Sequence, residues 1–420
     1  MSSVVEPSTL SFREARERVL AAAKPLPSET VPLAKARGRA LTRTFPAPHD
    51  LPPFRNSSMD GYAILTTDLT GASAAAPVTL PVVEVIPAGH VASRLLARGE
   101  AMRIMTGAMV PDGANAVVPF EEAARLMDAG AERVRFTRPA RHAENIRAAG
   151  RDLKAGEIPI PEGRELSAYD LALLASLGEA RVGVGSRPRV AILSTGDELL
   201  EVDQALRPGA IRDSNLPMLA MLVEECGGRV VSSGRSGDDP AEVATRMRAA
   251  LATCDVLLTI GGVSAGDFDP VKLGLGALGN VELWRVAMKP GRPQAFGTPE
   301  GKLFFGLPGN PASVACVFEA LVRPALRKLQ GFAALERPRV PVRAAHAIAS
   351  REGRTDFVRV TLEPRADALW ATVAGDQVSG HLTPQSRAHA LLIVSEERAT
   401  LAAGDAAEAL LLRWPDAKPA

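Results

Sequence analysis

The sequence predicts a multidomain α/β protein, and three patterns along its 420 residues support this prediction. Residues 187–331 alternate short apolar runs with helical patterns, as in βαβ units around a mostly parallel sheet. Residues 52–136 and the stretch from 337 onward show short strand-like runs separated by turns. We therefore expect a central α/β sandwich, an inserted β-rich domain, a linking domain of helical and extended segments, and a C-terminal β-barrel.

The expected domain boundaries follow these changes in pattern. Residues 1–48 and 147–186 each carry a helical pattern, and they flank the β-rich residues 49–146. We expect the flanking pieces to form one linking domain into which the β-rich piece is inserted, because domain termini often lie close together. The α/β domain is expected over residues 187–333 and the barrel over residues 334–420. A chain of this length is too long for one hydrophobic core.

Charge and cysteine content exclude several classes of protein. The formal net charge is +1, which argues against a protein that binds nucleic acid through a basic surface. Cys226, Cys254 and Cys316 form no Cys-x-x-Cys pair and lie in apolar runs, so we expect buried thiols in a reducing compartment. We expect neither a leader nor a membrane span, because no charged-then-apolar start and no apolar run of spanning length occur. A cytoplasmic protein is therefore expected, with no nucleic-acid or membrane partner.

The loop TIGGVSAGDFDP at residues 259–270 is the first candidate site. It follows the apolar run CDVLL, which has the length of a buried strand. Gly261 and Gly262 allow a sharp bend and a close approach to a ligand, and Asp267 and Asp269 follow. Ligand sites in open α/β sheets lie at such strand ends. For this loop alone, a tight turn with solvated acids is an equally good interpretation.

Three further segments favour a binding site. STGDEL at 194–199 places Asp197 and Glu198 after a strand-like run, and VAMKPGRP at 286–293 contains Lys289 and Arg292. FGLPGNPAS at 305–313 leads into a helical pattern, with Asn310 suited to the N-cap. Such a helix start is expected to offer backbone N–H groups to an oxyanion. Acids, cations and a helix start in one site predict a phosphorylated ligand together with a divalent metal.

The β-rich part contains two weaker candidates. PPFRNSSMDGYAIL at 52–65 includes Asp60, which spacing alone assigns to an ordinary Asp-Gly turn. Thr106 follows the strand-like run RIM, where its hydroxyl could face a ligand or close a turn.

The motifs together resemble those of the molybdopterin molybdenumtransferase (MoeA) family, which includes the E domains of gephyrin and plant Cnx proteins. The similar segments, in the order of the family, are PPFRNSSMDGYA, RIMTGAMVPDGANAVV, NIRAAGRDLKAGE, STGDEL, TIGGVSAGDFDPVK, MKPGRP and GLPGNPAS. The resemblance covers essentially the whole chain. It implies an antiparallel homodimer with a cleft shared between subunits. It also implies insertion of molybdate into adenylylated molybdopterin, with release of AMP and a requirement for Mg²⁺.

The resemblance also implies the site residues. The catalytic positions would be Asp60, Thr106, Asp152, Glu198, Asp269 and either Asp238 or Asp239, the first three acting with the α/β domain of the partner subunit. Glu198 and Asp269 would hold the metal. The substrate-binding positions would be Ser194, Gly196, Asp197, Gly261, Gly262, Ser264, Lys289, Arg292, Pro308, Gly309, Asn310, Pro311 and Ser313. Expected protein partners are molybdopterin adenylyltransferase and the proteins of molybdoenzyme maturation.

The proposed chemistry is consistent with these residue types. The substrate contains a pyrophosphate linkage and molybdate is a dianion, so Mg²⁺ and fixed cations are needed beside the carboxylates. We expect Lys289 and Arg292 to bind the oxyanion. Two positions depart from the family: Arg292 replaces a usual lysine, and His389 stands where asparagine is common. In the C-terminal domain, Arg359, Ser379 and Ser386 are further anion-contact candidates.

Two alternative functions remain open from the sequence. The adenylyltransferase that makes the adenylylated pterin has a fold that resembles residues 187–331, but it lacks the flanking domains and the SSMDGYA segment. A peptide-binding scaffold like the gephyrin E domain is the second alternative, although no added interaction region or linker is apparent.

Overall fold

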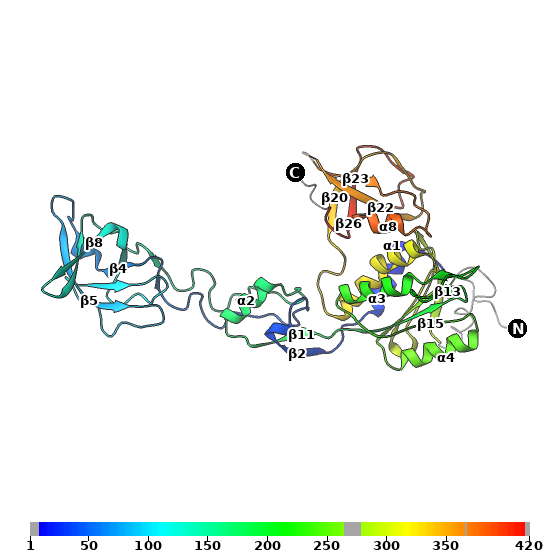
Figure 1. The fold of residues 1–420 in the computed structure, drawn as a ribbon, viewed down its shortest axis with the longest axis horizontal. Coiled ribbons are helices and arrows are strands. Elements are labelled where there is room, and N and C mark those ends of the chain that lie inside the picture. Colours follow the sequence, from blue (N-terminus) through cyan, green and yellow to red (C-terminus); the bar gives the residue numbers. More distant parts are fainter. Residues whose placement is uncertain (1–7, 264–278, 366–367, 416–420) are drawn as a thin grey trace. The chain divides into compact units, whose positions relative to one another are not determined.

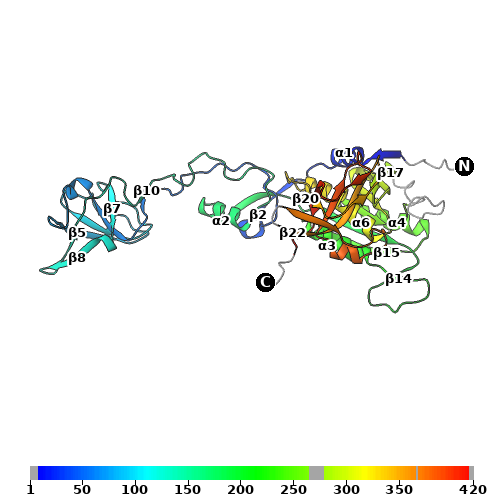
Figure 2. The same cartoon turned by 90° about the horizontal axis from the view of Figure 1, so that it is seen from above.

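The computed structural model describes residues 8–263, 279–365 and 368–415, and these residues form two compact units. Unit 1 contains residues 1–43, 162–172 and 179–420, and unit 2 contains residues 44–161 and 173–178. Figures 1 and 2 show the ribbon of each unit from two directions.

A mixed sheet forms the centre of unit 1. Four strands pair in parallel in the order β15, β12, β16, β19, and β18 and β17 continue the sheet antiparallel. β1 pairs with β17 in parallel at the edge. The bounds are β1 Ser8–Ser11, β12 Arg189–Thr195, β15 Arg229–Ser236, β16 Val256–Ile260, β17 Val281–Lys289, β18 Pro293–Gly297 and β19 Leu303–Leu307. The expected parallel order therefore holds for four strands. β17 and β18 are antiparallel because three residues join them, and a parallel crossover needs a much longer connection.

Helices cover both faces of this sheet, as expected for an α/β sandwich (Figure 1). α1, α3, α6 and α7 bury apolar side chains in one core cluster, and α4 buries its apolar side chains in the cluster on the other face. The bounds are α1 Phe12–Ala22, α3 Asn215–Glu225, α4 Pro240–Leu251, α6 Pro311–Val317 and α7 Arg323–Leu329. Ser11 and Glu14 form a capping box at α1, and Asp239 caps α4 ahead of Pro240.

A π-helical segment, η5 (Phe318–Val322), joins α6 to α7. Pro324 lies in the first turn of α7, where it has no N–H to donate to the preceding turn. Local widening to a π-helix is a known way to accommodate such a break. Gly331, with φ of +78°, follows the end of α7 in the left-handed conformation in which glycine commonly ends a helix.

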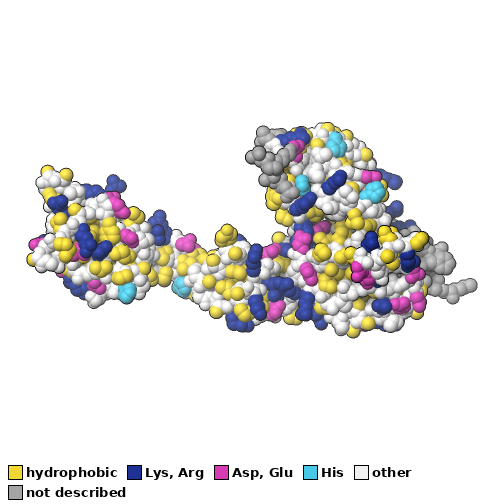
Figure 3. Space-filling view, viewed as in Figure 1, with side chains coloured by type: hydrophobic (Ala, Val, Ile, Leu, Met, Phe, Trp, Pro, Cys, Tyr) yellow, Lys and Arg dark blue, Asp and Glu magenta, His cyan; other side chains and the backbone are white. Residues whose placement is uncertain are grey.

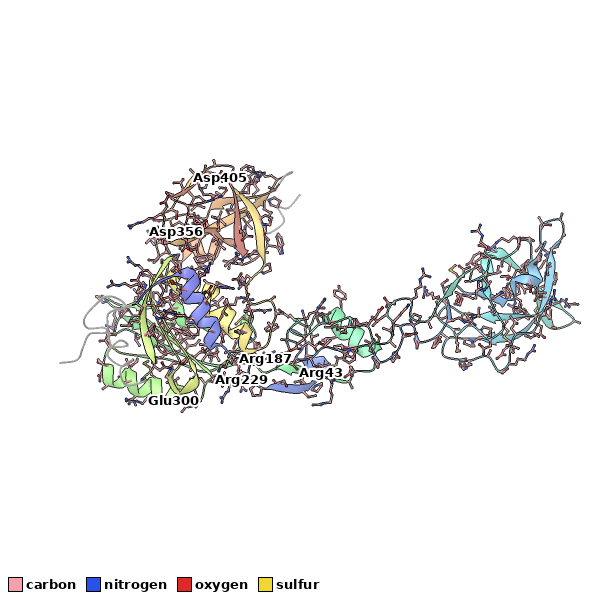
Figure 4. The ribbon with its side chains drawn as sticks, turned by 180° about the vertical axis from the view of Figure 1, so that it is seen from behind. Arg43, Arg187, Arg229, Glu300, Asp356 and Asp405 are labelled. Carbon is pink, nitrogen blue, oxygen red and sulfur yellow. The ribbon has the colours of Figure 1, made fainter. Side chains whose placement is uncertain are left out.

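The C-terminal part of unit 1 is a closed five-stranded barrel. Its strands pair in the order β22, β23, β20, β26, β24, and β24 returns to β22. The bounds are β20 Arg339–Ala344, β22 Thr355–Pro364, β23 Leu369–Val373, β24 Ala390–Val394 and β26 Ala406–Leu411. Pairing of β17 with β22 at Lys289 and Asp356 connects the barrel to the central sheet. Asp356 lies at the end of the barrel nearest that sheet, and Asp405 lies at the far end (Figure 4).

Unit 1 also contains a two-stranded ladder, in which β2 (Ser28–Pro32) pairs antiparallel with β11 (Arg181–Gly185). α2 (Ala168–Ser176) precedes β11 in the chain. The first part of α2 belongs to unit 1 and its last residues to unit 2.

Unit 2 is built on a six-stranded sheet with the order β7, β4, β6, β5, β9, β8. The bounds are β4 Gly61–Ile64, β5 Val78–Ile86, β6 Ala101–Ile104, β7 Ala116–Pro119, β8 Ala123–Asp128 and β9 Ala131–Phe136. Two apolar clusters cover its two faces. β3 (Asn56–Ser57) and β10 (Ile146–Arg147) form a short ladder beside it.

Charges of both signs are interspersed over the visible face of each unit (Figure 3), in line with the formal net charge of +1. In the part of the chain that the structure describes, no helix has both the length and the apolar character needed to span a membrane.

Candidate functional site

The parallel strands of unit 1 end in a crevice at a topological switch point. From β12 the chain passes through α3 to β15 on one side, and then through α4, on the opposite face, to β16 on the other side. Ligands bind at such points in open α/β sheets, because the divergent connections leave room beyond the carboxyl ends of the strands. A cavity of about 710 Å³ lies here, and we call it the acidic cavity. It is lined by residues that include Ser194, Gly196, Glu198, Asp213, Asn215, Asp238, Gly261, Gly262, Gly309, Asn310 and Pro311.

The two glycines after β16 shape this cavity as the sequence predicted. Gly261 and Gly262 have φ values of +83° and +71°, in the left-handed region that favours glycine. A Cβ on Gly261 would lie 3.0 Å from the carbonyl oxygen of Thr195, so the strand ends approach each other closely here. Both glycines line the cavity without side chains, which leaves its wall open to a ligand.

Asp197 and Asp238 are hydrogen-bonded to each other beyond the strand ends, whereas Asp239 caps a helix. The N–H of Asp238 donates to Asp197 Oδ1 at 3.2 Å, and the N–H of Asp197 donates to Asp238 Oδ2 at 3.4 Å. Asp238 lines the acidic cavity together with Glu198. Asp239 instead accepts the N–H of Ala241 at 3.0 Å as the N-cap of α4. Of the two neighbours, Asp238 is therefore the one that lines the acidic cavity.

Three buried polar residues of the acidic cavity each contain an atom without a hydrogen-bond partner among the residues that the structure describes. They are Asp213 (Oδ2), Asn215 (Oδ1) and Ser194 (Oγ). The family resemblance implied Ser194 as a site residue but did not include Asp213 or Asn215. The proximity of the IRDSN segment to STGDEL, by pairing of β13 (Leu199–Leu200) with β14 (Ile211–Arg212), was not evident from spacing.

A second cavity, of about 810 Å³, lies between the central sheet and the barrel. It is lined by five basic residues, and we call it the cationic cavity: Arg285, Lys289, Arg292, Arg351 and Arg354. Arg354 makes a double ion pair with Asp356, at 2.7 and 3.1 Å. The other four basic side chains have no carboxylate partner among the described residues. Arg285 and Arg351 were not predicted from the sequence.

Hydrogen bonds and packing against α6 hold the backbone of the loop that carries Lys289 and Arg292. Buried Gln294 donates through Nε2 to the carbonyl oxygen of Gly291 at 2.6 Å. A Cβ on Gly291 would lie 2.5 Å from Val317 Cγ2, so the loop packs directly on α6. The N–H of Val286 donates to the carbonyl oxygen of Arg292 at 2.9 Å. These contacts fix the backbone while the two cationic side chains remain exposed.

The loop before α6 separates the two cavities. Asn310 lines both of them, Pro308 and Ser313 line the cationic cavity, and Gly309 and Pro311 line the acidic cavity. Of the predicted acids and cations, Glu198 and Asp238 thus line one cavity and Lys289 and Arg292 line the other.

The start of α6 corrects one expectation. Its backbone N–H groups were expected to be free for an oxyanion, but that of Ala312 donates to the Ser379 carbonyl oxygen at 3.0 Å. Those of Ser313 and Val314 donate to the carbonyl oxygen of Asn310. Asn310 occupies the N-cap position but makes no side-chain cap, and its Nδ2 donates to Ser379 Oγ at 3.0 Å. Anion binding here must therefore rest on side chains.

The candidates of the barrel have structural partners. Arg359 is buried, and its guanidinium donates to Gln377 and to the carbonyl oxygens of Asp376, Val378 and His381. It therefore holds the 376–381 loop rather than facing a ligand. Ser386 lies outside both cavities. His389, at the position that departs from the family, accepts the N–H of Leu362 through Nδ1 at 2.9 Å.

In unit 2, the structure brings Asp60 and Thr106 together. The N–H and the hydroxyl of Thr106 both donate to Asp60 Oδ1, at 2.6 and 2.8 Å. The backbone bond and then the hydroxyl bond hold the pKa of Asp60 below its ordinary value, with a smaller contribution from Arg103. Asp60 is exposed, so it is a preorganised carboxylate rather than a closed turn. A Cβ on neighbouring Gly61 would lie 2.2 Å from the carbonyl oxygen of Val118, so only glycine fits there.

The structure gives less information on the remaining predicted site positions. Asp152 is exposed in unit 2, and its N–H donates to the carbonyl oxygen of Leu51 at 2.9 Å. Ser264 and Asp269 lie outside the described residues.

The three cysteines are free and buried, as predicted. Burial raises the pKa of Cys226 and of Cys254 to about 11, which leaves them unreactive.

The acidic cavity contains carboxylate oxygens that could bind a divalent metal. Among residues 8–263, 279–365 and 368–415, no group of three or more Asp, Glu, His or Cys side chains lies close enough to hold an ion. Mg²⁺ commonly takes only one or two carboxylates and completes its shell with water and substrate phosphates. Glu198, an oxygen donor in the acidic cavity, fits that pattern.

Three family profiles match consecutive parts of the chain. Residues 10–178 match the profile described as "MoeA N-terminal region (domain I and II)", residues 191–328 a "probable molybdopterin binding domain", and residues 341–412 the "MoeA C-terminal region (domain IV)". Molybdopterin molybdenumtransferase 2 of Mycobacterium tuberculosis is 38% identical over 381 residues, which cover 89% of this chain and 93% of the relative. The chain belongs to the molybdopterin molybdenumtransferase family.

Further relatives cover nearly the whole chain. The molybdopterin molybdenumtransferase of Haemophilus influenzae is 34% identical over 400 residues, covering 94% of this chain and 97% of the relative. The crystal structure of the molybdopterin biosynthesis MoeA protein from Pyrococcus horikoshii OT3 superposes with a TM-score of 0.83 at 30% identity, covering 96% of this chain and 100% of the other. The predicted family and the prediction of an enzyme are confirmed, and the family acts in molybdenum cofactor biosynthesis.

Proposed function

We propose that this protein inserts molybdate into adenylylated molybdopterin, releases AMP, and thereby forms the molybdenum cofactor. The observation that supports this proposal is the pair of cavities that meet at Asn310, one acidic and one cationic. Two anions must be brought together in this reaction. A wall with several cations that have no carboxylate partner among the described residues, beside a carboxylate-lined cavity, suits that task. Likeness to transferases over the full chain favours transfer over adenylylation, the alternative from the sequence.

The cationic cavity is proposed to bind molybdate. Lys289 and Arg292 are exposed on a braced loop and have no carboxylate partner in the described part of the chain. A fixed ammonium and a guanidinium neutralise a tetrahedral dianion without reorganising when it arrives. Pro308 and Ser313 line the same cavity and would limit its depth.

The acidic cavity is proposed to hold the phosphorylated end of the substrate through Mg²⁺. Glu198 would hold the ion together with Asp269, and Asp238 would orient water beside it. When bound, Mg²⁺ would polarise the phosphoanhydride and offset the charge of its oxygens. Gly196, Asp197, Gly261 and Gly262 would shape the backbone around the ligand, with Gly309 and Pro311 on the facing wall.

The enzyme is further proposed to act as a homodimer with a cleft shared between subunits. Asp60, Thr106 and Asp152 of one copy would act with the cavities of the other, which explains why Asp60 is preorganised by Thr106 yet exposed. Molybdopterin adenylyltransferase would supply the substrate, and maturation proteins would receive the product.

The direct test combines purified protein, adenylylated molybdopterin, molybdate and Mg²⁺, and measures AMP and active cofactor together. Both should appear in equal amounts, and Glu198→Gln should abolish both while the oligomeric state stays unchanged. AMP release without cofactor formation would disprove the transfer reaction.

Subunit mixing tests the shared cleft. Asp60→Asn and Glu198→Gln should each be inactive alone, because each removes one half of every site. After unfolding and co-refolding in equal amounts, about a quarter of wild-type activity should return, since half the dimers are mixed and each has one intact site. No recovery from demonstrably mixed dimers would disprove a site shared between copies.

A further inference from the structure

We infer that Arg103 of unit 2 is a further substrate-binding residue, whose guanidinium contacts a phosphate group of the ligand beside Asp60. This inference rests on the proposed function and deepens it, because it adds a cation to the half of the shared cleft that otherwise contributes carboxylates and a hydroxyl. Neither the family resemblance nor the comparisons with known proteins assign a role to this arginine.

The sheet of unit 2 fixes the position of Arg103. The residue lies on β6 directly opposite Tyr62 of β4, so the two side chains lie on the same face of the sheet. Its guanidinium carbon is 5.0 Å from the centre of the Phe120 ring, which is a cation–π contact. Phe120 is held in turn, because its N–H donates to the carbonyl oxygen of Asp60 at 3.1 Å and its ring meets that of Tyr62 edge to face. The arginine therefore rests on an aromatic support that is tied to the backbone of Asp60.

The guanidinium of Arg103 has no carboxylate partner among the described residues. Other arginines of unit 2 are paired, for example Arg125 with Glu132 and Arg138 with Glu144. The side chain of Arg103 forms neither an ion pair nor a hydrogen bond with any residue that the structure describes. Its Nε is buried, whereas its two terminal nitrogens are accessible. A cation–π contact leaves the full charge in place, so these nitrogens are available to an anion.

Asp60 lies within electrostatic range of this charge but is not paired with it. The two bonds from Thr106 lower the pKa of Asp60 most, and the charge of Arg103 lowers it further. Both bonds from Thr106 go to Oδ1, and within the described chain no ion pair joins the carboxylate to the guanidinium. An acceptor and a cation are therefore both available to one ligand at this place.

A phosphorylated ligand accounts for the presence of both charges. In the proposed shared cleft, Asp60 would act with an acidic cavity that already contains Glu198 and Asp238. A further carboxylate beside phosphate oxygens repels them, and a cation next to that carboxylate offsets the repulsion. The planar fork of N–H groups on Arg103 matches the oxygens of a phosphate. Asp60 is then free to accept a hydroxyl or N–H group of the same ligand.

AMP and adenosine, which differ only by the phosphate, test this contact in the full-length protein. The titrations contain Mg²⁺ and saturating molybdate, so that the cations of the cationic cavity are occupied. Wild-type protein should bind AMP more tightly than adenosine. Arg103→Gln should weaken AMP binding about ten- to a hundredfold and leave adenosine binding unchanged, because only charged hydrogen bonds to the phosphate are lost. Arg103→Lys, which keeps the charge but not the fork, should have an intermediate affinity for AMP.

Two controls separate phosphate binding from a structural role. Arg135→Gln removes an exposed arginine from β9 of the same sheet and should change neither affinity. The Tm of Arg103→Gln should fall only slightly, because a cation–π contact at a partly exposed site is weak. Three results would overturn the inference: an unchanged AMP affinity in Arg103→Gln, an equal loss of affinity for AMP and adenosine, or no preference of the wild-type protein for AMP.

Subunit mixing assigns Arg103 to the same half of the cleft as Asp60. Arg103→Gln co-refolded with Glu198→Gln should recover about a quarter of wild-type activity, since each mixed dimer has one intact site. Arg103→Gln co-refolded with Asp60→Asn should show no recovery, because both changes lie in unit 2 and no site is intact. Recovery in this second mixture would contradict the inference.

The AMP titration does not depend on molybdate transfer. A preference for AMP that Arg103→Gln removes supports the phosphate contact even if no molybdate is inserted. A transfer-active enzyme whose Arg103→Gln variant binds AMP as the wild type does refutes the phosphate contact alone and leaves the proposed function standing.

Discussion

Removal of the two exposed cations of the cationic cavity should weaken molybdate binding by a calculable amount. Lys289 and Arg292 line the cavity on a loop that Gln294 and Gly291 hold in place, so Gln substitutions should leave the backbone unchanged. Neither side chain has a carboxylate partner among the described residues, so no buried charge is left unpaired by the change.

The magnitude follows from Coulomb's law. A single charge about 4 Å from a dianion contributes roughly 2 kcal/mol at the dielectric constant of water. Both cations are exposed, so ionic screening near physiological salt lowers this to roughly 1 kcal/mol each. Lys289→Gln and Arg292→Gln should therefore each raise the Kd for molybdate about five- to tenfold, and the double variant about thirty- to a hundredfold.

Isothermal titration of molybdate into each variant at several salt concentrations measures this effect. The slope of affinity against salt should fall with each charge removed. Arg292→Lys restores the residue usual in the family and should stay within about threefold of wild type, because the charge is retained. Lys24→Gln, exposed and outside both cavities, is the control for a change in net charge.

Two results would refute the reasoning. A double variant that binds molybdate as tightly as wild type at low salt would show that the oxyanion binds elsewhere. Loss of binding in Lys24→Gln of the same size would show that the effect reflects overall charge rather than this cavity.

Three further predictions concern the carboxylate of unit 2 and the stability of each unit. Thr106→Val removes the hydroxyl bond to Asp60, so the pKa of Asp60 should rise and the acidic limb of the pH profile of kcat/KM should move to higher pH; an unmoved limb would contradict the role of this bond. Glu319→Gln breaks a buried double ion pair with Arg337, in which both contacts are 2.8 Å, and should lower the free energy of unfolding by about 3 kcal/mol. Urea unfolding followed by tryptophan fluorescence measures this change, because all tryptophans lie in unit 1. An unchanged unfolding midpoint would refute that estimate. Gly61→Ala should destabilise unit 2 by roughly 3 kcal/mol through its clash with Val118, and hydrogen exchange should show faster exchange in β4 and β7 only.

Local rules accounted for much of the fold. The bends at Gly261 and Gly262 lie where the sequence predicted them. Ser11, Asp239 and Gly331 occupy helix ends at which their residue types are favoured. Each depends on hydrogen bonds or dihedral angles within a few residues, so a single sequence suffices to predict it.

The hairpin of β17 and β18 shows where such rules fail. Its strand runs have the same apolar character as the parallel strands, and only pairing partners distinguish the two arrangements. Likewise, Asn310 was expected to cap α6 through its side chain, but Ser379 of the barrel, far along the chain, attracts that side chain instead.

The sequence by itself determined the family and the alternation of helices and strands in the α/β part, because motifs and periodicity are local properties. Only the tertiary structure decided that Glu198 lines one cavity while Lys289 and Arg292 line another, that Asp238 lines a cavity while Asp239 caps a helix, and that Arg359 supports a loop. It also revealed Asp213 and Asn215 as half-paired groups in a cavity wall. These facts depend on which distant segments share a hydrogen bond or a cavity, and burial is a property of the folded chain rather than of any one stretch.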